Sequence, residues 1–305
     1  MQKASKEKKS TFYFILRNIY YKIRAKALSY LSLLVRKKYI LNYSKKAKKA
    51  SSDSIMKNGY IYIALGTSFY KECISSAKIL KNFTKYPIHL FTDQKEISNK
   101  EKELFISIDQ VKNLHIRSKV DYISSSPFEN TIYLDTDIIV VRDIDELFEL
   151  LKNYDVLATL DTARKRENIS KLIKEYEKIP YAFGEVNGGL LGYSKNAKIN
   201  ILNKWPNVFY KYMDKTGGWD QPSLRILLWK NKTSLYILPP EFNVRSKKLL
   251  EKVKNNKIIF GEGHMSPRIY HMHINEDIYT TKESKIISLR EIVKKAMKKA
   301  YDIIY

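Results

Sequence analysis

Short apolar segments alternate with helical patterns between residues 58 and 275, and this alternation constrains the fold more than any other feature of the sequence. Strands that alternate with helices indicate an α/β domain whose sheet is largely parallel. Strands are predicted at residues 60–65, 88–92, 131–134, 155–160, 189–193, 234–238 and 268–272. The segment after the first strand repeats apolar residues every three or four positions, which predicts a helix.

Basic amphipathic patterns occupy both ends of the chain. Residues 1–56 are predicted to form an N-terminal extension and linker, residues 57–277 a single α/β domain, and residues 278–305 a C-terminal helix. Basic amphipathic helices can lie on an anionic membrane surface. Packing of the apolar stripe against the core explains either helix alone equally well, but the presence of two favours membrane association.

The charge of the chain calls for an anionic partner, although an AT-rich genome, which favours Lys, Ile, Asn and Tyr, also explains part of the excess. Its 305 residues carry a formal net charge of +24, and nucleic acid, acidic lipid and phosphorylated substrates all qualify. No apolar run approaches the ~18 residues that span a membrane, and charged residues interrupt the only candidate for a secretory signal. The only cysteine, Cys73, cannot form an internal disulfide. We therefore expect a cytoplasmic protein, peripheral at the inner face of a membrane.

Two carboxylates stand one residue apart directly after the predicted strand 131–134. Asp135 and Asp137 precede the apolar run 138–141, and two carboxylates in such surroundings are costly to bury without a cation. Mn²⁺ and Mg²⁺ prefer hard oxygen ligands and offset the repulsion. Ligands of open α/β sheets bind outside the carboxyl ends of the strands, so the pair predicts a divalent-cation site at that edge.

The segment around these carboxylates resembles a known family. Residues 133–148, with the sequence YLDTDIIVVRDIDELF, are very similar to the metal-binding segment of GT-A fold glycosyltransferases, particularly the glycogenin-like and lipopolysaccharide galactosyltransferase group, family 8. The resemblance runs from about residue 60 to about residue 275. It implies an α/β, GT-A (Rossmann-like) nucleotide-diphospho-sugar transferase fold, here a single domain with amphipathic helical ends.

The resemblance also implies a reaction and its partners. A hexose or N-acetylhexosamine would pass from a nucleotide-sugar donor, a UDP-sugar, to a hydroxyl of a glycan or lipid-linked acceptor. The cofactor would be Mn²⁺ or Mg²⁺, and an anionic membrane surface is a further expected partner.

The nucleotide side of the site is assigned by the same resemblance. Family members hold uracil and ribose after the first strand, where this chain has Ala64, Gly66, Thr67 and Tyr70. Without the resemblance, these residues indicate an ordinary strand-to-helix turn, capped by Thr67 or Ser68.

Side chains near the carboxylates are expected to contact the donor phosphates. Lys119 stands where the family's diphosphate-contacting basic residue stands, with Arg117 as a close rival. In a chain this basic, either residue can instead be a solvated surface group. Thr136, between the two carboxylates, belongs to the same cofactor-binding segment.

Four residues are expected to surround the donor sugar. Asp161 follows a predicted strand and resembles a residue that contacts sugar hydroxyls, and Asn187 resembles the asparagine of the family's Asn-x-Gly segment. A plain Gly-Gly loop before a strand is the alternative for the latter. Asp220 and Gln221 resemble the Asp-Gln pair beside the reacting carbon of retaining members. Asp220 can also be a helix N-cap, with Pro222 at the first helical position.

The stereochemical course is left open by the residues themselves. In a retaining reaction, which the resemblance implies, no dedicated base is needed and Gln221 lines the reacting face. In an inverting reaction, Asp220 is the candidate base.

The third metal ligand is expected at the end of the domain. Segment 269–271, Ile-Tyr-His, is similar to the family's strand end that supplies a histidine, His271 here. Neutral imidazole is a competent ligand of Mn²⁺. His273 points the same way along a strand and stays an alternative. The Lys-Pro-Trp that usually follows in the family is missing, so Lys282 or a residue elsewhere in the chain must replace its lysine, if any residue does.

Two other functions compete with this one. A non-catalytic basic protein that binds nucleic acid or membrane explains the charge but leaves Asp135, Asp137 and His271 unexplained, so nucleic acid is not an expected partner. A sugar nucleotidylyltransferase-like enzyme has a similar architecture. It should carry a glycine-rich loop with a basic residue, which the Gly-Thr-Ser at 66–68 does not provide.

Overall fold

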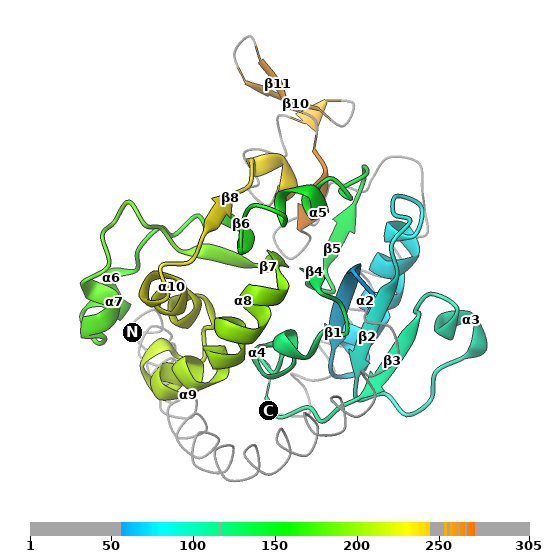
Figure 1. Ribbon diagram of the computed structural model, residues 1–305, viewed down its shortest axis with the longest axis horizontal. Coiled ribbons are helices and arrows are strands. Elements are labelled where there is room, and N and C mark those ends of the chain that lie inside the picture. The colour runs from blue at the N-terminus through cyan, green and yellow to red at the C-terminus, as the bar shows by residue number, and fades with distance from the viewer. Residues whose placement is uncertain are drawn as a thin grey trace, which may run out of the picture.

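The computed structural model describes residues 56–115, 117–244 and 267–271, and the backbone of residues 253–254, 257–260 and 263–265. Within this part of the chain, helices cover both faces of a seven-stranded sheet (Figure 1). The predicted terminal helices lie outside the described residues, as do His273 and Lys282.

The main sheet has the strand order β3-β2-β1-β4-β7-β6-β8. Its strands are β1 (Asn58–Ala64), β2 (Ile88–Thr92), β3 (Ser107–Gln110), β4 (Asn130–Leu134), β6 (Val156–Leu160), β7 (Val186–Tyr193) and β8 (Leu235–Ile237). Neighbouring strands are parallel, except that β7 is antiparallel to both β4 and β6. The predicted α/β architecture is confirmed, and β7 makes the sheet a mixed one.

The two faces of β1 show why the sheet lies at the centre. The longer helices are α2 (Thr67–Leu80), α9 (Trp205–Thr216) and α10 (Gln221–Lys230). Successive side chains of a strand point to opposite faces. Tyr60 and Tyr62 pack in one cluster with residues of α2, whereas Ile61 and Ile63 pack in another with residues of α9 and α10. Because both faces are covered, residues 60–64 of β1 are all apolar instead of alternating with polar residues.

Shorter elements complete the described structure. The remaining helices are α3 (Asn99–Lys102), α4 (Lys119–Tyr122), α5 (Leu147–Leu150), α6 (Glu167–Ser170), α7 (Lys174–Glu177), α8 (Lys195–Asn200), η1 (Ile123–Ser125), η2 (Leu202–Lys204) and η3 (Pro240–Phe242). The remaining strands are β5 (Ile138–Val140), β9 (Val253–Lys254), β10 (Lys257–Phe260), β11 (Gly263–Met265) and β12 (Ile269–His271). Among the described helices, none has the length and apolar character needed to cross a bilayer.

Two strands of the main sheet differ most from their sequence-based predictions. The strand predicted at 189–193 begins earlier, at Val186, so Asn187 and the two glycines after it lie inside a buried strand. The alternative of a Gly-Gly loop is therefore wrong. Strand β3, at the edge of the sheet, was not predicted, because Ser-Ile-Asp-Gln carries too few apolar residues to give a strand pattern.

Candidate active site

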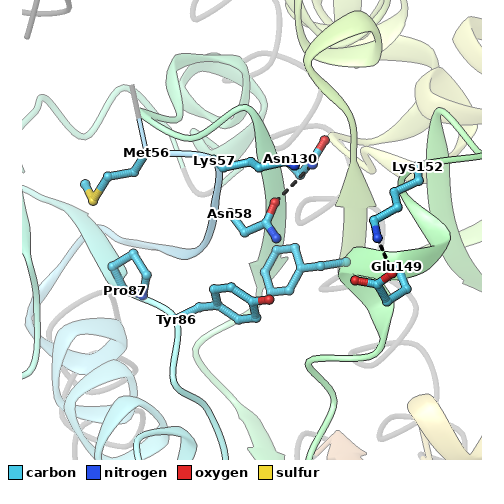
Figure 2. Close-up of a pocket in the computed structure, with 9 residues that line it drawn as sticks. Met56, Lys57, Asn58, Tyr86, Pro87, Asn130, Glu149 and Lys152 are labelled. Atoms are coloured by element: carbon cyan, nitrogen blue, oxygen red, sulfur yellow. Dashed lines mark hydrogen bonds and ion pairs between the residues drawn. The ribbon is translucent and has the colours of Figure 1, made fainter. Parts of the chain in front are cut away.

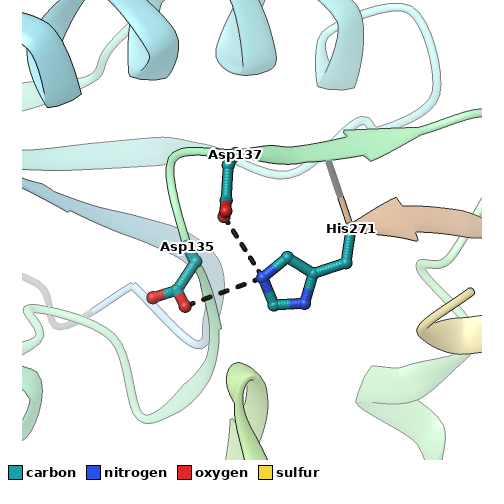
Figure 3. A group of neighbouring side chains, drawn as sticks. All are labelled: Asp135, Asp137 and His271. Atoms are coloured by element: carbon teal, nitrogen blue, oxygen red, sulfur yellow. Dashed lines mark ion pairs between the residues drawn. The ribbon is translucent and has the colours of Figure 1, made fainter. Parts of the chain in front are cut away.

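Three potential metal ligands meet at the carboxyl end of β4 (Figure 3). Asp135 follows β4 directly, and Asp137 precedes β5. Strand β12 pairs with β5 in antiparallel register, which places His271 opposite Ile138. The Nε2 atom of His271 lies 3.2 Å from Oδ1 of Asp137 and 4.0 Å from Oδ2 of Asp135. The tertiary structure thus joins the predicted Asp-Asp pair to the predicted histidine.

The composition of this group fits the predicted divalent cation. One ligand atom from each of the three side chains can be chosen so that all lie within 4.8 Å of one another. Two hard carboxylates and one imidazole suit Mn²⁺ or Mg²⁺. Each of the two aspartate side chains is 23% exposed, which leaves a side of the group open to phosphate oxygens or water.

A glycine makes room for the histidine. A Cβ at Gly189 would lie only 2.3 Å from Cε1 of His271, so any larger residue would displace the imidazole. The backbone oxygen of Gly189 also accepts a hydrogen bond from the Asp135 amide at 2.7 Å. The absence of a side chain at Gly189 therefore leaves room for the imidazole of His271.

Lys119 connects the metal group to the candidate sugar side. Its ammonium donates to Asp135 at 3.0 Å and to the backbone oxygen of Gly188 at 3.0 Å, and lies 3.3 Å from Asp220. Burial lowers the pKa of Lys119, but the Asp135 and Asp220 carboxylates outweigh it and raise the pKa above its ordinary value. Lys119 is thus held as a cation inside the site.

Asp220 is buried among positive charges. Lys119 lies 3.3 Å from one of its oxygens, and the Nε atom of Arg117 lies 3.9 Å from the other. Burial raises the pKa of Asp220, but Lys119 and then Arg117 outweigh burial and hold the pKa below its ordinary value. Asp220 occupies the N-cap position of α10 without a side-chain cap, and the helix begins at Gln221. The prediction of Pro222 as first helical residue is therefore wrong by one position.

The other candidate sugar-binding residues share one hydrogen-bond network. One carboxylate oxygen of Asp161 accepts from Gln221 at 2.8 Å and from Asn187 at 3.3 Å. The other accepts from Arg166 at 3.3 Å, and Arg166 also donates to Gln221 at 3.2 Å. The guanidinium of Arg166 lies 4.1 Å from the ring centre of Trp219. Asp161, Asn187 and Gln221 are therefore brought together, as predicted.

The predicted nucleotide-binding residues lie at the turn between β1 and α2. Gly66 has a φ of 96°, a conformation that favours glycine, and its amide donates to Asp93 at 2.8 Å. Gly66 is itself the N-cap of α2, and no side chain caps the helix. The alternative of a cap by Thr67 or Ser68 is therefore wrong, because the helix begins at Thr67 and both residues are already helical.

One hydrogen bond joins helix α2, which follows this turn, to the segment that carries Asp135 and Asp137. Thr136, between the two aspartates, donates to Glu72 of α2 at 2.9 Å. Ala64, at the end of β1, and Tyr70, on α2, are both buried. The roles of these residues, and of the others in the site, stay predictions.

A separate surface hollow of about 500 Å³ lies at the other edge of the sheet (Figure 2). It is lined by Asn58 and Asn130, the first residues of β1 and β4, whose side chains hydrogen-bond at 3.0 Å. Tyr86 and Phe148 also line it and meet edge to face, with ring centroids 4.5 Å apart. None of its nine lining residues is a predicted site residue.

The known proteins that are similar to this chain include curated relatives and solved structures. No family model matches the chain. Two curated relatives, glucoside xylosyltransferase 1 of Gallus gallus and of Homo sapiens, are 26% and 28% identical over 135 and 136 residues. Each match covers 38% of this chain and only 30% of the relative, so the chain spans about a third of the length of these relatives.

Solved structures show the fold. The galactosyltransferase LgtC, in complex with donor and acceptor sugar analogs, is similar with a TM-score of 0.50 and 12% identity, over 78% of this chain and 95% of LgtC. The apo form of the glycosyltransferase GlyE of Streptococcus pneumoniae TIGR4 gives 0.51 and 16%, over 80% of this chain and 64% of GlyE. The chain has the GT-A fold and resembles family 8 glycosyltransferases.

Several side chains of this GT-A site were missed by sequence reasoning. Asn243 contacts His271, Arg166 joins Asp161 to Gln221, and Tyr133 donates to Asp135. Only Tyr133 had a usable signal, because it stands two residues before Asp135 and so points to the same side of the extended chain. Asn243 and Arg166 lie in irregular segments, where no periodicity indicates which way a side chain points.

Proposed function

We propose that this protein is a metal-dependent, retaining glycosyltransferase that moves a sugar from a UDP-sugar to a hydroxyl of a glycan or lipid-linked acceptor. The observation that carries the proposal is the meeting of Asp135, Asp137 and His271 beside the Lys119–Asp220 pair. A metal-ligand set next to a buried cation, at the carboxyl edge of an α/β sheet, suits a metal-bound diphosphate.

The metal ligands and Lys119 would each stabilise the leaving group in a different way. Mn²⁺ or Mg²⁺ held by Asp135, Asp137 and His271 would act as a Lewis acid toward the departing diphosphate. Lys119 supplies a fixed positive charge next to this group, 3.0 Å from Asp135. Because protein groups hold the ammonium in place before a donor binds, little reorganisation is needed when negative charge develops.

The hydrogen-bond network around Asp161 supports a role in positioning the sugar. Asp161, Asn187 and Gln221 offer amide and carboxylate groups already oriented by one another, and such groups can exchange these bonds for bonds to sugar hydroxyls. Asp220 has a depressed pKa, which makes it a poor general base. This favours the retaining course over an inverting one in which Asp220 would be the base.

The donor sugar is proposed to be a hexose or N-acetylhexosamine. The similar proteins include a galactosyltransferase and xylosyltransferases by name, so a pentose donor must be tested beside the hexoses. UDP-galactose, UDP-glucose, UDP-N-acetylglucosamine and UDP-xylose form the minimal panel.

Donor hydrolysis by the purified protein tests the proposal. We expect UDP release from at least one donor with Mn²⁺, abolished by chelator, and Asp137→Asn should lower the rate on the order of 10²-fold or more. Asn130→Ala, at the opposite edge of the sheet, is the control and should retain activity. If no donor is turned over or bound and Asp137→Asn equals wild type, the proposal is wrong.

Association with an anionic membrane at the cytoplasmic face is proposed on the charge of +24 and the basic amphipathic ends. Flotation with anionic vesicles should recover the protein, and recovery should fall with salt. Equal recovery with zwitterionic vesicles would contradict an electrostatic attachment. Salt-sensitive DNA binding that persists in Asp137→Asn, without donor turnover, would favour a non-catalytic nucleic-acid binder instead.

A further inference from the structure

The imidazole of His271 forms a hydrogen bond with the buried side-chain amide of Asn243. Its Nδ1 atom lies 2.9 Å from Oδ1 of Asn243, on the side of the ring away from Asp135 and Asp137. The other amide atom, Nδ2 of Asn243, donates to the hydroxyl of Thr159 at 2.8 Å. Asn243, Thr159 and His271 are each less than 9% exposed.

This chain of contacts determines which ring nitrogen faces the carboxylates. An amide oxygen can only accept a hydrogen bond, so Nδ1 of His271 must carry the proton. In the neutral ring the lone pair is then on Nε2, which lies 3.2 Å from Asp137. The hydrogen bond made by one ring nitrogen generally sets which nitrogen is available to a metal.

The backbone around Asn243 fixes the position of its amide. The backbone N–H of Asn243, the residue after η3, donates to the backbone oxygen of Pro240 at 3.1 Å. The next residue, Val244, donates to Ile269 at 2.9 Å and accepts from His271 at 3.2 Å. The segment that carries Asn243 is therefore joined by main-chain hydrogen bonds to the strand that carries His271.

We propose that Asn243, oriented by Thr159, is a positioning residue for metal binding. It holds His271 in the Nδ1–H tautomer and aims Nε2 at the space between Asp135 and Asp137. This inference rests on the metal site of the proposed function. It concerns affinity for the cation and adds no group that touches the donor.

Mn²⁺ titration followed by the electron paramagnetic resonance of the free ion tests the inference. Asn243→Ala should bind Mn²⁺ about 10- to 100-fold more weakly than wild type, the usual effect of losing such a partner. Asn243→Asp should stay close to wild type, because a carboxylate also accepts from Nδ1. Thr159→Val should give a smaller loss than Asn243→Ala, since it removes only the group that orients the amide.

Asn130→Ala serves as the matched control, because it removes an amide that hydrogen-bonds at 3.0 Å far from the metal group. It should leave Mn²⁺ affinity unchanged. A folding defect in Asn243→Ala would appear as a lowered melting temperature. In that case the Mn²⁺ affinities of Thr159→Val and Asn243→Asp are compared instead. If both variants bind Mn²⁺ as tightly as wild type, the proposal is wrong.

A spectroscopic measurement tests the tautomer without any change at Asn243. In the ¹⁵N-labelled protein saturated with Mg²⁺, the ring nitrogens of His271 should show the proton on Nδ1, with His271→Gln used to assign the signals. A proton on Nε2 would overturn the proposal.

Failure of this inference is distinguishable from failure of the proposed function. If Asp137→Asn and His271→Gln bind Mn²⁺ as tightly as wild type, the metal site itself is wrong. If those two variants lose affinity while Asn243→Ala, well folded, does not, only the role of Asn243 is wrong.

Discussion

Two lysines, one near the carboxyl ends and one near the amino ends of the sheet strands, show how differently one type of side chain can be paired. Lys119, at the carboxyl edge, lies 3.0 Å from Asp135 and 3.3 Å from Asp220. Lys198, on α8 near the start of β4, instead donates to the backbone oxygens of Ser126, at 3.0 Å, and Phe128. One lysine is paired with carboxylates and the other with carbonyl groups.

The pKa values of the two ammonium groups shift in opposite directions. Burial works against the charge of both. At Lys119 the two carboxylates outweigh burial and raise the pKa. At Lys198 burial, aided by the charge of Lys195, lowers the pKa to about 8. The carboxyl edge thus concentrates opposite charges, as a site for a cation and a diphosphate needs, whereas the amino edge uses a lysine to satisfy backbone carbonyls.

Replacement of Lys119 should have the largest effect. Lys119→Met removes the nearest cation from Asp220 and Asp135 and leaves Arg117, at 3.9 Å, beside Asp220 alone. The loss should lower the free energy of unfolding by on the order of 3 kcal/mol. Donor turnover should fall about 10²-fold, because a fixed positive charge beside the leaving group is lost. Urea unfolding and the UDP-release assay measure the two effects.

Lys198→Met is the matched control, since it makes the same substitution at the other edge. It should lower stability by about 1–3 kcal/mol, as expected for hydrogen bonds from a charged donor, and leave turnover intact. The contrast between the edges would break down if both variants lost turnover equally, because activity would then follow general stability.

Two glycines of β7 offer a second, smaller contrast. A Cβ at Gly189 would meet His271 at 2.3 Å, and one at Gly192 would meet Leu157 at 3.0 Å. Gly189→Ala must displace the imidazole, so we expect Mn²⁺ affinity to fall about tenfold or more and stability to fall by about 1–3 kcal/mol.

Gly192→Ala crowds only an apolar side chain of the neighbouring strand β6. It should lower stability by about 1–3 kcal/mol and leave Mn²⁺ affinity unchanged. Titration of Mn²⁺ at a temperature where both variants are folded separates the two results. Unchanged affinity in Gly189→Ala would show that the imidazole of His271 can bind the ion from a displaced position.

The fold could be predicted from the sequence where burial dictates composition. Strands β1, β2 and β4 lie inside the sheet with both faces covered, so their apolar runs stand out. The edge strand β3 could not be predicted, because an exposed strand need not be apolar. The reversed direction of β7 could not be predicted either, since strand patterns carry no direction.

Some residues of the candidate site could likewise be predicted from the sequence, and others could not. Asp135 and Asp137 could be found from their place after a strand, and the resemblance located His271, Asp220 and Gln221. Asn243 and Arg166 could not, because their importance comes from tertiary contacts of irregular segments. A residue that acts through another leaves no pattern in the sequence. Its role appears only when both partners are placed.

The pH dependence of stability gives the most specific contrast. The pKa of Lys198 is about 8 in the folded protein and 10.5 ordinarily, so between these values the unfolded chain binds more protons than the folded one. Stability therefore rises with pH through this window. Wild type should gain stability relative to Lys198→Met between pH 8 and pH 10 in urea unfolding. Parallel curves would mean that Lys198 keeps an ordinary pKa, and that its carbonyl partners hold the charged form as well as water does.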